Sequence, residues 1–303
     1  MTAVVPTARP ARWKGARRLG DGRHLYWWIE ICACLCYYAV YSTIRNLIDH
    51  DKAIAFHHAT QLISLQQHLG INHEESLQQW ALHWRPIVIS MNYVYGSLHF
   101  IVTAGVGIYL YRRFTDDYPL WRNALALTTG VALVGFYSWP LMPPRLLPHH
   151  YAFVDTLAKY PTIWSFNSGA MSAISNQYAA MPSLHCAWSL WCACAMVPRV
   201  RSRWAKVAFA CYPVLTVTAI VLTANHYLLD AVGGFAVFGI GYLFSWQFTR
   251  AGRIRPGRTG RAVEPEQEDA RPPEPLVVRA GPGDQGPGEG AGPYRGDDPE
   301  DRV

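Results

Sequence analysis

Charged side chains are scarce in this chain of 303 residues: 16% of the residues are charged, whereas 50% are hydrophobic. The apolar residues fall in long blocks, which argues against a water-soluble globular domain and for a polytopic membrane protein. A helix of roughly 20 apolar residues is needed to cross about 30 Å of hydrocarbon. Six stretches meet this requirement, and we predict spans near residues 25–47, 87–111, 120–141, 182–198, 204–223 and 228–249.

The sequence also lacks the cysteine spacing of a disulfide framework or of a paired zinc site. We interpret the cysteines as small apolar packing residues, because all of them lie inside the predicted spans. No small-residue cleavage pattern follows the first apolar run, so we expect the first span to stay as an anchor. The cysteines are Cys32, Cys34, Cys36, Cys186, Cys192, Cys194 and Cys211.

Basic residues are sparse on one side of the predicted spans. That side carries Arg45, Lys52, Arg85, Arg145 and Lys159. The other side is richer in arginine and lysine. It consists of the segments before the first span and after the last, and the connections between spans two and three and between spans four and five. By the positive-inside rule both termini are cytoplasmic, in agreement with an even number of spans. Topology accounts for these basic clusters, and we predict no nucleic-acid partner.

Composition divides the chain into three regions. We predict a basic cytoplasmic segment at 1–24, a six-helix membrane domain at 25–250 and a cytoplasmic tail at 251–303. The tail is rich in Pro, Gly, Arg, Asp and Glu and has few residues that could build a core, so we predict that it is disordered. The predicted fold class is therefore all-α: a multi-pass protein of the cell membrane with a six-transmembrane-helix bundle.

Two connections on the sparsely basic side are longer than simple turns. Residues 50–84 are amphipathic and predict one or two helices in the outer interface, broken near Gly70. Residues 142–181 are rich in Pro, Tyr and Trp and show little periodic pattern. They predict a loop folded over the helix ends.

Two histidines near the water-facing ends of predicted spans are the most informative residues. His185 ends the run Met181-Pro182-Ser183-Leu184-His185, and His226 has Asp230 four residues beyond it. An ionisable side chain at the edge of a span is costly and indicates a functional site by default. Residues at i and i+4 lie on one helix face, so we predict that Asp230 hydrogen-bonds one ring nitrogen of His226 and leaves the other free to react.

The predicted topology brings further polar groups to the same extracytoplasmic edge. Arg145 follows span three, Ser183 opens span four, and Asn225 lies in the turn between spans five and six. We expect Pro182 to be the first residue of a helix, whose N–H groups and dipole form an anion pocket. The start of span six adds a second helix N-terminus. Arg145 lies among prolines and offers a guanidinium fork for phosphate oxygens.

These residues resemble the motifs of the type 2 phosphatidic acid phosphatase superfamily, which also includes vanadium haloperoxidases and bacterial acid phosphatases. The run Pro182-Ser183-Leu184-His185 looks like the family's Pro-Ser-x-His motif, and His226 with Asp230 looks like its His-x-x-x-Asp motif. Pro143-Pro144-Arg145 and Thr223-Ala224-Asn225-His226-Tyr227 look closer to the subgroup of fungal inositol phosphorylceramide synthases. The resemblance covers roughly residues 50–250, with three motifs in family order.

The resemblance implies a role for each motif residue. His226 would attack phosphorus and form a phosphohistidine while Asp230 orients it. His185 would protonate the leaving oxygen. Arg145 and Ser183 would hold the non-bridging oxygens. Neither a metal nor a cofactor is expected.

The chain departs from the fuller family pattern at two positions. Ser138 stands where that pattern has a Lys, and Ile220 stands where it has an Arg, so two phosphate-binding cations are absent. Either Asn225, Tyr227 and helix N-termini bind phosphate in their place, or the activity is weak.

The expected partner is a lipid phosphate at the outer leaflet, either a phospholipid or a polyprenyl phosphate. Water and an alcohol such as inositol both stay open as acceptors, because one phosphoenzyme serves either. The oligomeric state also stays open. Two rival hypotheses are a zinc site made by the two histidines and Asp230, and a non-catalytic lipid-binding or transport protein with a degenerate site. Glu30, Arg45 and His99 are expected to be structural or to act only through neighbouring residues.

Overall fold

The computed structural model describes residues 16–47, 51–160, 178 and 180–253. Over these ranges the chain is mostly helical, in agreement with the predicted class. The last helix continues to Arg253, past the predicted boundary at residue 250. The rest of the predicted tail, and the basic residues before residue 16, lie outside the described ranges.

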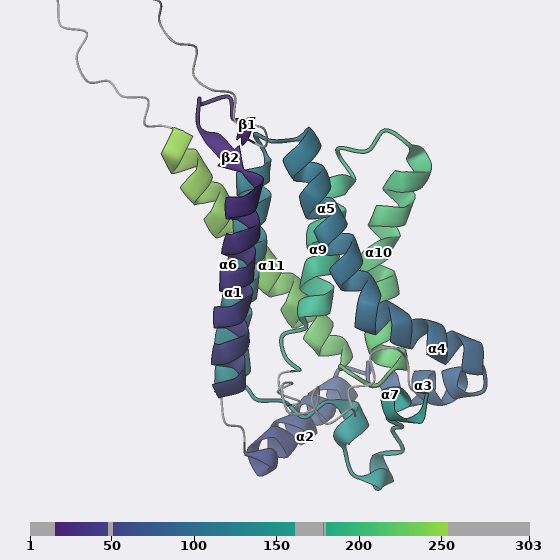
Figure 1. Cartoon of the computed structure of the whole chain (residues 1–303). Coiled ribbons are helices and arrows are strands. Elements are labelled where there is room, and N and C mark those ends of the chain that lie inside the picture. The colour runs from purple at the N-terminus through teal and green to yellow at the C-terminus, as the bar shows by residue number, and fades with distance from the viewer. Residues whose placement is uncertain (1–15, 48–50, 161–177, 179, 254–303) are drawn as a thin grey trace, which may run out of the picture. The chain divides into compact units, whose positions relative to one another are not determined.

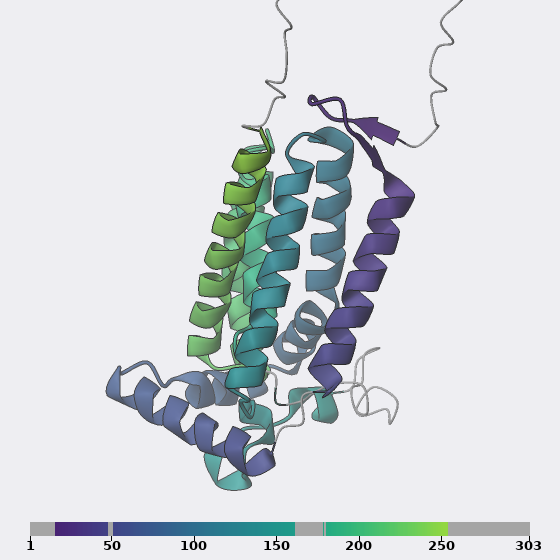
Figure 2. The same cartoon turned by 90° about the vertical axis from the view of Figure 1, so that its left-hand side faces the viewer.

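Long helices lie side by side and form the body of the structure (Figures 1 and 2). They are α1 (Trp27–Leu47), α5 (His99–Arg113), α6 (Tyr118–Ser138), α9 (Leu184–Met196), α10 (Arg203–Leu222) and α11 (Leu228–Arg253). α9 packs against α5, α6, α10 and α11, and α6 packs against α5, α9 and α11. α1 packs against α6.

Within the described residues, four stretches are long and apolar enough to cross a membrane. They are Trp27–Arg45, Arg85–Arg113, Arg203–Leu222 and Leu228–Arg250. These match predicted spans one, two, five and six. Predicted span three is α6, which contains Arg122 and Asn123 near its start and is not among the four. Predicted span four is α9, whose 13 residues extend about 20 Å at a rise of 1.5 Å each. The count of six spans therefore stays a prediction.

Shorter helices cross the end of the bundle where α9 and α11 begin (Figures 1 and 2). Two of them, α2 (Lys52–His68) and α3 (Glu74–Leu82), are joined by a turn in which Gly70 has a φ of +70°. Glycine adopts this left-handed φ without steric cost, and the prediction of helices broken near Gly70 is confirmed. The described part of the predicted 142–181 loop contains η2 (Pro144–Leu146), η3 (His149–Tyr151) and α7 (Thr156–Lys159). We call these five elements the end cap.

The end cap is packed onto the bundle through small and apolar side chains. Ala55 and Ala59 of α2 are fully buried in a cluster with Leu141, Met142 and Tyr227. Tyr227 belongs to the connection between α10 and α11, so the cap is held directly against that connection.

One long helix connects the end cap to the far end of the bundle. It consists of α4 (Arg85–Tyr93), the π-turn η1 (Val94–Leu98) and α5. A π-turn inserts an extra residue into a helix and is frequent at functional sites.

The first described residues form a β-hairpin, which the all-α prediction did not include. β1 (Ala16–Arg18) pairs antiparallel with β2 (His24–Tyr26). The turn contains Asp21-Gly22, a common hairpin sequence, and Gly22 has a φ of +87°. These strands are short and leave the mostly helical class unchanged.

Glu30 and Arg45, the two charges near the first span, have different surroundings. The Nη1 atom of Arg122 lies 2.7 and 2.9 Å from the Glu30 carboxylate oxygens, and the Tyr118 hydroxyl donates to the same group. Glu30 thus joins α1 to α6, which confirms a structural role. The guanidinium of Arg45 lies 5.7 Å from the centre of the Tyr41 ring.

Candidate active site

The connection between α10 and α11 positions His226. Ala224 has a left-handed φ of 53°, and its N–H donates to the carbonyl of Val221. The N–H groups of Asn225 and His226 donate to the carbonyl of Ile220, at 3.0 and 3.3 Å. A left-handed residue that closes the last turn is a common helix ending. The chain therefore turns back at this point and leaves His226 at the capped end of the bundle.

His226 and Asp230 form the predicted pair, although not on one helix face. The Nδ1 atom of His226 lies 3.3 Å from Oδ2 of Asp230, which also accepts the N–H of Tyr227 at 3.0 Å. Because α11 begins at Leu228, His226 precedes the helix, and the shared carboxylate brings the two side chains together. Asp230 is fully buried. The contact at Nδ1 leaves Nε2 of His226 as the nitrogen available for chemistry.

His185, in the first turn of α9, faces the same pair. The ring centroids of His185 and His226 lie 5.6 Å apart, with the ring planes at 63°. The ring of Tyr95, from the π-turn η1, stacks on His185 at 4.3 Å. The ring of His99 lies 4.2 Å from His185, so His99 contacts the site through His185. The long helix formed by η1 and α5 thus contacts the His185 ring through two aromatic rings, Tyr95 and His99.

The start of α9 differs from the prediction. Ser183 is the N-cap and α9 begins at Leu184, so Pro182 lies before the cap and its predicted place as the first helical residue is wrong. Serine is a preferred N-cap residue, and Pro182 instead packs between α6 and α11, against Gly135 and Gly233. The N–H of Ser183 donates to the Asp230 carbonyl at 3.0 Å, which joins the starts of α9 and α11.

Several donors at the start of α9 have no protein acceptor. The Oγ atom of Ser183 is buried and has no hydrogen-bond partner among the described residues. The backbone N–H groups of Leu184, His185 and Cys186 likewise donate to no acceptor among the described residues. A helix N-terminus with free N–H groups and a free hydroxyl favours an anion.

The N-terminus of α11, in contrast, is already capped. The N–H of Leu228 donates to Oε1 of Glu74, and the N–H of Leu229 donates to Oε1 of Gln66. This helix end therefore does not form the second open anion site that the sequence predicted. Neither Glu74 nor Gln66 was singled out from the sequence, where they are two polar residues among many in an amphipathic segment.

The side chains of Asn225 and Tyr227 are engaged within the protein. The amide nitrogen of Asn225 lies 2.8 Å from Oγ1 of Thr223 and 3.3 Å from its carbonyl. The hydroxyl of Tyr227 donates to the carbonyl of Met142 at 3.0 Å. Burial raises the pKa of Tyr227 well above its usual value, so this hydroxyl keeps its proton. Phosphate binding by Asn225 stays a prediction.

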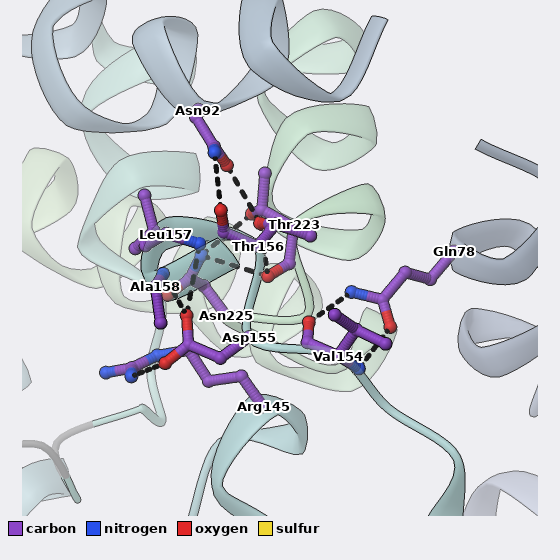
Figure 3. A network of polar contacts seen from close by, with 10 residues as sticks. All are labelled: Gln78, Asn92, Arg145, Val154, Asp155, Thr156, Leu157, Ala158, Thr223 and Asn225. Carbon is purple, nitrogen blue, oxygen red and sulfur yellow. Dashed lines mark hydrogen bonds and ion pairs between the residues drawn. The ribbon is translucent and has the colours of Figure 1, made fainter. Parts of the chain in front are cut away.

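Arg145 is brought to the His226 connection by its own backbone. Its N–H donates to the carbonyl of Ala224 at 2.8 Å. Its Nη1 atom lies 3.1 Å from Oδ2 of Asp155, as Figure 3 shows. The Nε atom is buried and has no hydrogen-bond partner among the described residues. The guanidinium is thus held on one edge and keeps a donor for a ligand.

A polar network holds the segment that carries Asp155 (Figure 3). Oδ1 of Asp155 accepts the N–H groups of Leu157 and Ala158 and so caps α7. The hydroxyl of Thr156 donates to Oδ1 of Asn92, whose amide donates to the Thr156 carbonyl at 3.0 Å. Asn92 therefore joins α4 to α7.

On the other side of this segment, Gln78 of α3 exchanges two hydrogen bonds with the backbone of Val154, at 2.8 and 3.0 Å (Figure 3). Asp155 was missed in the sequence, although an aspartate before Thr-Leu-Ala-Lys is a recognisable N-cap pattern.

The two positions that depart from the family pattern provide no substitute cation. The hydroxyl of Ser138 donates to the carbonyl of Val134 in its own helix. Ile220 is fully buried against Cys186 and Ala231. Among the described residues, Arg145 is therefore the cation tied directly to the His226 connection.

The zinc hypothesis requires several ligands around one point. Across the described ranges, no group of three or more His, Cys, Asp or Glu side chains is arranged to hold a metal ion. All seven cysteines lie within these ranges as free thiols. Cys186 and Cys192 are buried, as expected of packing residues, whereas the other five are exposed: Cys32, Cys34, Cys36, Cys194 and Cys211.

Part of the chain matches a known protein family. Residues 60–244 match the model of a family described as the PAP2 superfamily. The match covers more than half of the chain and includes every candidate site residue. No curated protein and no solved structure matches the chain.

Proposed function

The chain belongs to the PAP2 superfamily, the type 2 phosphatidic acid phosphatases, and on this basis we propose that it is a membrane phosphatase or phosphotransferase that acts on a lipid phosphate. Membership supports phosphatase-type enzyme activity, and the apolar helices support a membrane location. The proposed substrates are phospholipids and polyprenyl phosphates.

The convergence of His185, His226 and Asp230 is the observation that carries the proposal. Nε2 of His226 attacks phosphorus as the bond to the leaving oxygen breaks, and a phosphohistidine forms. His185 gives its proton to the leaving oxygen. Asp230 holds Nδ1 of His226 and stabilises the charge on the ring. In the second step an acceptor hydroxyl attacks the phosphorus of the phosphohistidine, the bond between phosphorus and Nε2 breaks and frees His226, and His185 takes the acceptor's proton.

The unpaired donors around these histidines suit the charge of a phosphoryl group. Arg145 Nε, the Ser183 hydroxyl and the free N–H groups at the start of α9 are hydrogen-bond donors without protein partners among the described residues. Fixed donors aimed at developing negative charge stabilise the transition state of phosphoryl transfer. We assign the non-bridging oxygens to this side of the site, since the start of α11 is capped by Glu74 and Gln66.

We place the site at the extracytoplasmic face. It lies where α9 and α11 begin and α10 ends, whereas Arg112, Arg113, Arg199 and Arg203 lie at the opposite helix ends. The positive-inside rule assigns the arginine-rich ends to the cytoplasm.

The acceptor is the finer part of the proposal. The run Thr223-Ala224-Asn225-His226-Tyr227 resembles the fungal inositol phosphorylceramide synthases, which are transferases, and we therefore propose an alcohol such as inositol as an acceptor alongside water. A phosphohistidine serves both, and the occupant of the acceptor site decides the product.

The test is phosphate release by the purified protein in detergent from a panel of phosphatidic acids and polyprenyl phosphates, with and without inositol. His226→Ala should abolish turnover and phosphoenzyme labelling, whereas His24→Ala, at an exposed histidine of the hairpin, should retain both. Addition of EDTA should leave the rate unchanged. A loss that zinc restores would support the zinc hypothesis, and binding of lipid without turnover would support the non-catalytic one.

A further inference from the structure

The N-terminus of the helix that follows the proposed nucleophile is capped by residues from the end cap. The N–H of Leu228 donates to Glu74 at 2.9 Å, and the N–H of Leu229 donates to Gln66 at 3.2 Å. These acceptors lie 154 and 163 residues away in the sequence, in α3 and α2. The first turn of α11 is therefore capped by a separate part of the fold.

Glu74 and Gln66 form one buried unit. Gln66 is fully buried and Glu74 is 2% exposed. The Gln66 amide nitrogen donates to Oε1 of Glu74 at 2.5 Å, so one oxygen accepts both this bond and the Leu228 N–H. A buried carboxylate is costly unless it is hydrogen-bonded, and a helix N-terminus offsets part of that cost. Oε2 of Glu74 has no partner among the described residues, which adds to the cost.

The position of this unit affects which hydrogen-bond donors the Asp230 carboxylate contacts. Oδ2 of Asp230 is shared between the N–H of Tyr227 and the ring of His226. If the N–H groups of Leu228 and Leu229 lost their acceptors, Asp230 would be the carboxylate on the same turn able to satisfy them. A carboxylate drawn to those donors would leave Nδ1 of His226. By accepting the two N–H groups, Glu74 and Gln66 keep Asp230 for the histidine.

We propose that Glu74 and Gln66 are positioning residues for His226, acting through α11 and Asp230. This inference rests on the proposed function, in which His226 is the nucleophile. It makes α2 and α3 part of the catalytic apparatus rather than only a cover over the helix ends.

The first experiment measures kcat and KM for Glu74→Ala, with Glu75→Ala as the matched control. Glu75 is the next residue of α3 and is exposed. We expect kcat and the single-turnover rate of phosphoenzyme formation to fall about 10-fold to 100-fold in Glu74→Ala, as for a displaced reacting group. KM should change little, because neither residue binds the lipid. Glu74→Gln keeps an acceptor oxygen and should restore most of the rate.

A second experiment does not depend on activity. Hydrogen–deuterium exchange of peptides covering residues 224–232 should speed up at Leu228 and Leu229 in Glu74→Ala and stay unchanged in Glu75→Ala. Gln66→Met and Gln67→Met form a second pair, buried and exposed respectively. This pair tests the same capping if Glu74→Ala does not fold.

The outcomes separate this inference from the proposed function. A wild-type protein that turns over no lipid phosphate would refute the proposed function and the positioning role with it. An active wild type whose Glu74→Ala variant keeps its kcat, or changes only KM, would refute the positioning role alone. Unchanged exchange at Leu228 and Leu229 would show that the capping bonds are not formed in solution.

Discussion

At the scale of single residues, the Asp230 carboxylate contacts two groups through one of its oxygens. It is fully buried, it accepts the N–H of Tyr227, and it contacts Nδ1 of His226. The i,i+4 spacing predicts such a contact, but the structure forms it across a helix start. Spacing identified the partners, because four residues bring two side chains near each other in either geometry. Only the fold shows that Asp230 also accepts the backbone N–H of Tyr227, just before α11 begins.

Replacing Asp230 by asparagine tests this double role. The amide oxygen of Asp230→Asn can accept one of the two hydrogen bonds but carries no charge to stabilise the histidine ring. We expect kcat to fall roughly 100-fold or more, as when the carboxylate behind a catalytic histidine is neutralised, while the protein still folds. Steady-state kinetics and a thermal melt in detergent measure the two effects. Full activity in Asp230→Asn would remove Asp230 from the mechanism.

At the scale of elements, the contact between the starts of α9 and α11 sets the geometry of the site. The Ser183 N–H donates to the Asp230 carbonyl, and a Cβ placed on Gly234 would meet the carbonyl oxygen of Ser183 and the side chain of Cys186. Glycine at this position lets the backbones of two helices approach. The sequence shows Gly233-Gly234 inside an apolar run, and nothing local indicates which helix approaches it.

Gly234→Ala should therefore push α9 away from α11. We expect a loss of about 1–3 kcal/mol in the free energy of unfolding, the usual cost of overpacking, and a large loss of turnover because Ser183 and His185 move. Gly239→Ala is the matched control in the same helix, since a Cβ there has nothing within 4 Å. Thermal stability and kcat of the two variants decide the matter. Equal thermal stability and equal kcat in the two variants would mean that α9 and α11 accommodate the added methyl group without loss of stability or activity.

At the scale of the whole molecule, the arrangement of helices separates two chemically different ends within the described residues. The end cap and the starts of α9 and α11 lie at one end of the bundle, and the C-terminal ends of α5 and α9 lie at the other (Figure 1). His185 is in the first turn of α9, whereas Arg112 and Arg113 are in the last turn of α5. Hydropathy alone predicted that the chain crosses a membrane. The number of crossings is less directly readable, because α9 is short and α6 carries polar residues near its start.

The predicted sidedness is testable in intact cells. A membrane-impermeant thiol reagent should label His149→Cys, at an exposed position of η3, and should leave Arg201→Cys, between α9 and α10, unlabelled until the membrane is opened. The unsubstituted chain, with its own seven cysteines, provides the background. Labelling of Arg201→Cys alone would place the site on the cytoplasmic side and reverse the topology.

The sequence by itself determined the features that depend on local chemistry. Long apolar runs predicted membrane helices, Gly70 predicted the break between α2 and α3, and the motif residues His185 and His226 were identified from their places at span ends. Each of these features depends on neighbours a few residues away. The hairpin at Asp21-Gly22 was open to the same reasoning, since its turn signal is local.

Tertiary structure alone decided which distant groups complete the site. Sequence spacing does not predict three of these contacts. They are the capping of α11 by Glu74 and Gln66, the ion pair of Arg145 with Asp155, and the contact of His99 with His185. The predicted anion site at α11 failed for this reason. A helix N-terminus is open or capped according to what packs against it, and the residues that cap α11 lie more than 150 positions earlier in the chain.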